Sequence, residues 1–101
     1  MDRYLEERLG ADVLSDFCRR NHIRRLSLFG STVSGRSRKG SDIDILVEFQ
    51  EGRVPGYLGM SRLQGELQDL LGMKVDLRTP AELSRYFRDD VLREAEVQYA
   101  T

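Results

Sequence analysis

Residues 28–47 read LFGSTVSGRSRKGSDIDILV, and this stretch decides the fold. Apolar residues alternate with polar ones from Ile23 to Phe29, which predicts a strand that ends at Gly30. The glycine- and serine-rich stretch that follows predicts a turn and loop, with one helical turn after Ser31. Asp42–Phe49 alternates at first and then becomes mostly apolar, as is typical of a central strand. We therefore expect two strands joined by a polar loop.

Segments whose apolar residues recur at helical spacing lie before and after these two strands. Residues 2–22 predict a helix that Gly10 interrupts, which leaves two short helices. Residues 58–71 carry apolar side chains on one face, so we expect an amphipathic helix that ends at Gly72. Residues 73–78 predict a short strand.

A last helical region is expected to begin with Thr79 as N-cap and Pro80 in the first turn. Its apolar stripe would consist of Leu83, Phe87, Val91, Leu92 and Ala95, with a break near Asp89–Asp90. The order helix, strand, loop, strand, helix, strand, helix predicts an α/β or α+β domain, in which helices pack on a small mixed sheet.

Composition excludes several classes of protein. A chain of 101 residues predicts one domain spanning 1–101. One cysteine, Cys18, cannot form an internal disulfide, and one histidine, His22, cannot build a multi-histidine zinc site. We expect Cys18 in the core and His22 at a helix end. A net charge of −1 argues against direct nucleic-acid binding, no apolar run is long enough for a membrane helix, and the chain is expected in the cytoplasm.

Three aspartates are the candidate metal-binding and catalytic residues. Asp42 and Asp44 are separated by one residue on a strand, so their side chains point to the same face. Such carboxylates repel one another unless a cation joins them, and hard oxygen ligands suit Mg²⁺. If the strand around Asp76 pairs beside the first pair, this third carboxylate points into the same site. Three such carboxylates can hold two metal ions for in-line phosphoryl or nucleotidyl transfer.

The glycine–serine turn supplies groups for phosphates. Gly30 permits close approach of a ligand to the backbone, and Ser31 offers N–H and hydroxyl donors. Arg36 and Arg38 place positive charge in the same loop, where it suits the outer phosphates of a triphosphate.

The motifs in residues 28–31, 41–47 and 75–77 together resemble the DNA polymerase β-like nucleotidyltransferase superfamily. The short length and the ending Val91–Ala95 are similar to its minimal branch, the MNT proteins of HEPN–MNT toxin–antitoxin pairs. The resemblance implies that Asp42 and Asp44 bind both Mg²⁺ ions, that Asp76 completes the site, and that Gly30 and Ser31 hold nucleotide phosphates. It also implies an antitoxin that transfers AMP from ATP to a tyrosine of a HEPN ribonuclease toxin, within a hetero-oligomer.

One position departs from the family pattern and leaves alternatives open. Ser34 stands where many members carry an arginine that contacts the triphosphate, although Arg36 or Arg38 could compensate. A catalytically weak antitoxin that neutralises the toxin by binding alone is therefore the second hypothesis. A nucleotidyltransferase for a small molecule such as an aminoglycoside would need a further acceptor-binding domain, and a sugar transferase with an Asp–x–Asp motif would not fit this length.

Overall fold

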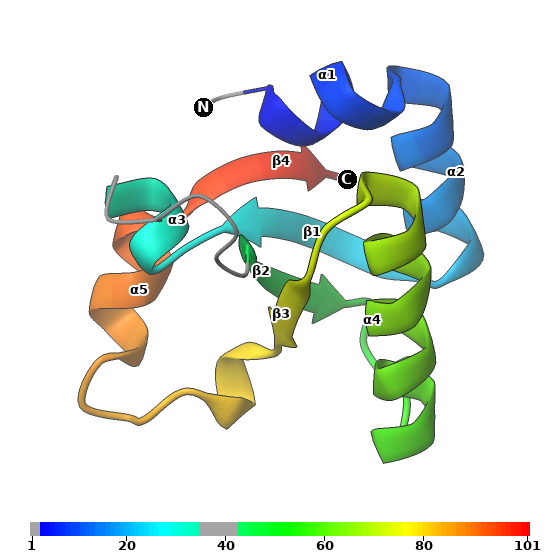
Figure 1. Ribbon diagram of the computed structural model, residues 1–101. Coiled ribbons are helices and arrows are strands. Elements are labelled where there is room, and N and C mark those ends of the chain that lie inside the picture. The colour runs from blue at the N-terminus through cyan, green and yellow to red at the C-terminus, as the bar shows by residue number, and fades with distance from the viewer. Residues whose placement is uncertain (1–2, 35–42) are drawn as a thin grey trace.

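A four-stranded mixed sheet forms the centre of the computed structural model, which describes residues 3–34 and 43–101 (Figure 1). The strands run in the order β3-β2-β1-β4 across the sheet. Their bounds are β1 (Ile23–Leu28), β2 (Ile43–Phe49), β3 (Val75–Arg78) and β4 (Glu96–Ala100). The helices are α1 (Tyr4–Leu9), α2 (Ala11–Arg20), α3 (Ser31–Ser34), α4 (Tyr57–Leu71), a 3₁₀ turn η1 (Pro80–Glu82) and α5 (Arg88–Glu94).

The expected α+β class with a mixed sheet is confirmed. β1 pairs antiparallel with both β2 and β4, whereas β2 and β3 are parallel. The parallel pair is possible because α4 carries the chain back along the sheet between β2 and β3.

One face of the sheet is covered by three helices. Alternate residues of β1 and β2, such as Leu26, Leu28 and Ile45, are buried in one cluster with Phe17 of α2 and Leu67 of α4. α1 adds Leu5 to the same cluster. The opposite face therefore presents the other set of strand residues, and we call it the carboxylate face because Asp44 and Asp76 belong to it.

The interruption of the first helix at Gly10 is confirmed. Gly10 adopts φ 88° and ψ 146°, so it ends α1 after Leu9 and α2 begins at Ala11. Positive φ is accessible to glycine without the clash that a Cβ would cause, and the chain can turn there in a single residue. The predicted end of α4 at Gly72 is confirmed too, since Gly72 lies in the left-handed region.

The C-terminal region differs from the sequence-based expectation. The break falls between η1 and α5, upstream of Asp89–Asp90, and the chain ends in the strand β4. The expected apolar stripe is not a core face: Phe87 is 63% exposed, and α5 buries none of its residues. Within the part of the chain that the structure describes, no helix is long and apolar enough to cross a membrane.

Candidate active site

Two of the three aspartates lie side by side on neighbouring strands. Asp44 of β2 and Asp76 of β3 are register partners in the parallel pair. Paired residues on parallel strands point to the same face, and the strands are about 4.8 Å apart. The expected pairing of the strand around Asp76 beside that around Asp44 is thus confirmed. Asp42 lies outside the described residues, as do Arg36 and Arg38.

Gly30 packs directly against the Asp44 carboxylate. It has φ +62°, and a Cβ built on it would lie 2.8 Å from Oδ2 of Asp44. Any larger residue would therefore displace the carboxylate as well as strain the backbone. The glycine turn and the aspartate form one compact unit, in which the backbone after β1 borders an acidic side chain.

The turn is fixed to β2 through hydrogen bonds. The buried hydroxyl of Thr32 in α3 accepts a hydrogen bond from the Asp44 N–H at 2.8 Å. The Phe29 N–H donates to the Asp44 carbonyl at 3.1 Å, and the Val33 N–H donates to the Gly30 carbonyl at 3.2 Å. Because the Asp44 backbone is held on both sides, its side chain projects from a fixed point beside Gly30.

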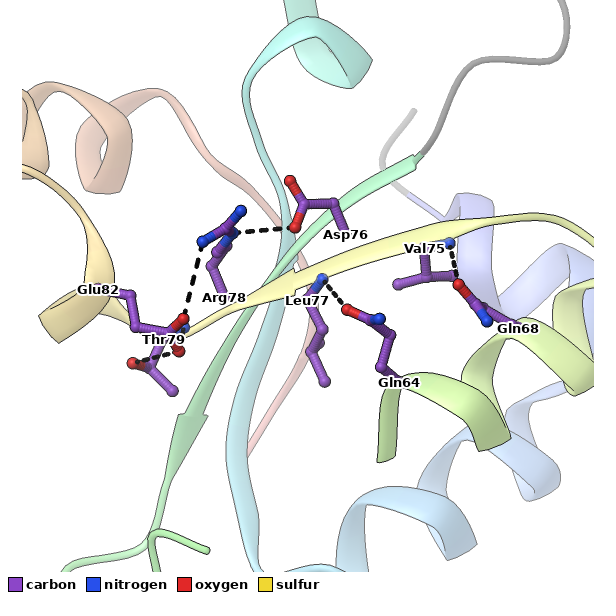
Figure 2. Close-up of polar contacts among 8 residues, drawn as sticks. All are labelled: Gln64, Gln68, Val75, Asp76, Leu77, Arg78, Thr79 and Glu82. Atoms are coloured by element: carbon purple, nitrogen blue, oxygen red, sulfur yellow. Dashed lines mark hydrogen bonds and ion pairs between the residues drawn. The ribbon is translucent and has the colours of Figure 1, made fainter. Parts of the chain in front are cut away.

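Asp76 has a cationic neighbour on its own strand (Figure 2). Nε of Arg78 lies 2.9 Å from Oδ1 of Asp76, and Nη1 lies 3.9 Å from Oε2 of Glu82. Glu82 is itself tied to Thr79, whose N–H donates to Oε1 at 3.2 Å. Arg78 thus offsets part of the negative charge on this face and orients one Asp76 oxygen.

Two glutamine side chains of α4 accept hydrogen bonds from backbone N–H groups on the outer edge of β3 (Figure 2). The Val75 N–H donates to Oε1 of Gln68 at 3.1 Å, and the Leu77 N–H donates to Oε1 of Gln64 at 3.2 Å. These side chains take the place of a fifth strand. The strand that carries Asp76 is therefore held between β2 on one side and α4 on the other.

One cavity borders Asp76 and another borders Gly30. A cleft of about 490 Å³ follows the outer edge of β3, between residues 54–64 and residues 76–82. We call it the β3 cleft, and Asp76 is part of its wall. A second cavity of about 350 Å³ lies between α3 and α5, where it is lined by Gly30, Val33, Val91, Glu94 and Ala95.

The carboxylates that the structure describes fit a hard divalent cation. Carboxylate oxygens from adjacent strands are the donors that Mg²⁺ takes in proteins that also bind phosphates. Among residues 3–34 and 43–101, no group of three or more histidine, cysteine or acidic side chains is placed to hold a metal ion. Asp44 and Asp76 are two carboxylates on adjacent strands, and the third expected ligand, Asp42, is not among the described residues.

Two residues of this arrangement were not singled out from the sequence. Arg78 follows Asp76 by two positions on a strand, so the alternation rule places both on one face and was a usable signal. The support of Asp44 by Thr32 had no such signal, because it depends on how α3 folds back onto β2.

The chain is similar to known proteins in sequence and in fold. The chain is 40% identical over 72 residues to the protein adenylyltransferase MntA of Thermococcus cleftensis, and the match covers 71% of each protein. It superposes with a TM-score of 0.71 on a solved structure assigned as a minimal nucleotidyltransferase, at 38% identity over 91% of this chain and 90% of that one.

A third similarity is to a toxin–antitoxin structure. The chain matches a solved structure of the tri-AMPylated Shewanella oneidensis HEPN toxin in complex with MNT antitoxin, with a TM-score of 0.63 and 22% identity. This match covers 89% of the present chain and 69% of the other, and at this identity it shows a shared fold.

The sheet and the helices that cover it have the fold of a minimal nucleotidyltransferase. Residues 11–98 match the nucleotidyltransferase domain family, and the chain belongs to that family. The resemblance to the minimal branch, seen first in the sequence, is confirmed.

Proposed function

We propose that this nucleotidyltransferase is an Mg²⁺-dependent protein adenylyltransferase that acts as an antitoxin. It transfers AMP from ATP to a hydroxyl, that of a tyrosine, on a partner HEPN ribonuclease toxin, with which it forms a hetero-oligomer. The observation that carries this proposal is the alignment of Asp44 with Asp76, with Gly30 packed against Asp44. This arrangement provides carboxylates for metal ions and, next to them, backbone without side chains for phosphates.

Each proposed residue has a role in this reaction. Asp42 and Asp44 would hold both Mg²⁺ ions and Asp76 would complete the site, and the ions would neutralise charge on the phosphates and activate the acceptor oxygen. Gly30 and Ser31 contact the nucleotide phosphates, and Arg36 and Arg38 contribute positive charge. Ser31 begins α3 directly after Gly30, which is consistent with its proposed place beside Asp44.

The transfer itself is a displacement at the α-phosphorus. The acceptor oxygen forms a bond to phosphorus, the bond to the bridging oxygen breaks, and pyrophosphate leaves with the electron pair. Asp76 accepts the proton of the acceptor hydroxyl. Arg78 holds Oδ1 of Asp76, so Oδ2 is the oxygen that we assign to this proton.

The partner and the nucleotide are supported by the relatives. The Thermococcus protein is named a protein adenylyltransferase, and the Shewanella structure contains an AMPylated HEPN toxin with its MNT antitoxin.

Intact mass spectrometry tests the proposal. The chain is incubated with ATP, Mg²⁺ and the partner HEPN protein, and the HEPN protein should gain the mass of AMP. The variants Asp44→Asn and Asp42→Asn should abolish the gain, as should removal of the metal by a chelator, because the metal ligands are lost. Asp69→Asn, on the exposed side of α4, is the matched control and should leave the transfer intact.

The same experiment separates the second hypothesis, which Ser34 favours. If the HEPN protein is fully neutralised while its mass stays unchanged, the chain acts by binding alone, and the enzymatic proposal is overturned.

A further inference from the structure

We propose that the β3 cleft is the acceptor site, where a segment of the partner protein binds and presents a tyrosine to Asp76. This inference rests on the proposed function, because Asp76 receives the acceptor proton there. It adds a location for the acceptor and a physical basis for the choice of a tyrosine.

The position of the cleft follows from the strand order. Gly30 follows β1, Asp44 lies on β2 and Asp76 lies on β3, which is the edge strand. The cleft is lined by Asp76, Leu77 and Arg78 of this edge strand and by residues within the segment 54–64. The two carboxylates therefore separate Gly30 on one side from the cleft on the other, and the cavity beside Gly30 shares no lining residue with the cleft.

The geometry of the displacement assigns the two sides. The attacking and leaving oxygens lie roughly in line on opposite sides of the phosphorus. If the outer phosphates lie at the Gly30 turn, pyrophosphate leaves on that side and the acceptor must arrive from the side of Asp76. The β3 cleft is the space that opens there, and its volume of about 490 Å³ is in the range of ligand-binding pockets.

The walls of the cleft differ in chemistry. Tyr57 and Val54 form an apolar wall and are 87% and 64% exposed, and the half-buried Met60 lies beside them. The lining also includes Asp76 and Arg78 of β3, which are charged. A tyrosine matches both parts of the lining, because its ring can pack against apolar side chains while its hydroxyl reaches a polar group. A serine would reach the carboxylate without covering the apolar wall.

The tyrosine oxygen bonds to the α-phosphorus, the bond to pyrophosphate breaks, and the phenolic proton passes to Oδ2 of Asp76. Arg78 stays paired with Oδ1, 2.9 Å from its Nε, and holds that carboxylate oxygen in place.

The test measures how the rate of AMP transfer depends on the concentration of the HEPN protein. The double variant Val54→Ser, Tyr57→Ser should raise the KM for the HEPN protein at least about tenfold and leave the KM for ATP within twofold. Both side chains are exposed, so the melting temperature should stay unchanged. The single variant Tyr57→Phe should keep a KM for the HEPN protein close to that of the wild-type chain, since the ring and its contact area are kept.

The matched control removes exposed aromatic residues elsewhere. Tyr86 and Phe87 are 77% and 63% exposed and lie outside the cleft. The variant Tyr86→Ser, Phe87→Ser should leave the KM for the HEPN protein within twofold.

Two outcomes would overturn the assignment in distinguishable ways. If the wild-type chain transfers AMP and the Val54, Tyr57 variant keeps its KM for the HEPN protein, the acceptor binds elsewhere while the proposed function stands. If the wild-type chain transfers no AMP, the proposed function fails and the acceptor site fails with it.

Discussion

At the scale of single residues, the close contact between Gly30 and Asp44 couples the backbone turn to a candidate site residue. We expect Gly30→Ala to destabilise the fold by about 1 kcal/mol, because alanine is strained at φ +62°. It should also reduce AMP transfer by at least about tenfold, since its Cβ would displace the Asp44 carboxylate. Urea denaturation gives the first quantity and an AMP-transfer assay gives the second.

Gly72→Ala is the matched control for this substitution. Gly72 has φ +68°, yet a Cβ there would meet no atom within 4 Å. The backbone cost should be similar, about 1 kcal/mol, with AMP transfer unchanged. Equal losses of activity in the two variants would show that the contact with Asp44 has no functional weight.

Cys18 provides a pH-dependent prediction. Burial raises the pKa of its thiol to about 12 from 9.0, because the charged thiolate is desolvated in the core. The folded state therefore keeps the proton that the unfolded chain loses above pH 9. This contribution to stability is complete below pH 9 and is lost as the pH rises from 9 to about 12.

The measurement compares the wild-type chain with Cys18→Ala. The difference in unfolding free energy between them should decrease across that pH range, whereas the cavity left by alanine adds only a constant offset. The folded wild-type thiol should also resist alkylation at pH 8, and rapid alkylation without unfolding would contradict its burial.

The strands of this site can be predicted from the sequence, whereas the contacts between its residues cannot. Periodicity is local, so it identified the strands that carry Asp44 and Asp76 and the glycine that ends β1. That Asp44 and Asp76 become register partners depends on the crossover through α4, and the 2.8 Å approach of Gly30 depends on how α3 turns. Both are tertiary facts without a periodic signal.

At the scale of elements, the C-terminal region shows how periodicity misleads. Phe87, Val91 and Leu92 have helical spacing, yet none is buried, because α5 lies beside α3 at one end of the sheet (Figure 1). β4 has only five residues, and two of them, Val97 and Tyr99, are apolar in alternation. Such a short segment is assigned by its partner β1, whose edge it covers.

The hydrogen bonds between the β3 edge and the glutamines of α4 should contribute to stability. Gln64→Ala should destabilise the fold by about 1 kcal/mol, because the Leu77 N–H loses its partner at 3.2 Å. Gln68→Ala should have a similar effect through Val75, and the double variant should associate with itself at high concentration, since an unpaired strand edge accepts another strand.

The control for these variants is Gln50→Ala, at an exposed position directly after β2. Urea denaturation and sedimentation velocity provide the two measurements. If Gln64→Ala and Gln50→Ala are equally stable, water replaces the glutamine at no cost and the edge needs no protection.

At the scale of the whole molecule, β4 connects the two ends of the described chain. It pairs with β1 on one side, and Oε1 of Gln98 accepts a hydrogen bond from the Leu5 N–H at 2.9 Å. Leu5 is fully buried in α1, where the N–H groups of the first turn have no partner within the helix. The last strand therefore fixes the first helix over the core.

Removing this strand should affect regions far from the carboxylates. Deletion of residues 96–101 removes the β1–β4 ladder and uncovers an edge of β1, and we expect a loss on the order of 3 kcal/mol, since each hydrogen bond contributes about 1 kcal/mol. Gln98→Ala is the milder variant and should cost about 1 kcal/mol and unfold α1 first, which hydrogen exchange of the Leu5 amide reports. Val97→Ala, at a position 47% exposed, should leave that exchange unchanged. Unaltered protection of Leu5 in Gln98→Ala would show that packing alone holds α1 on the core.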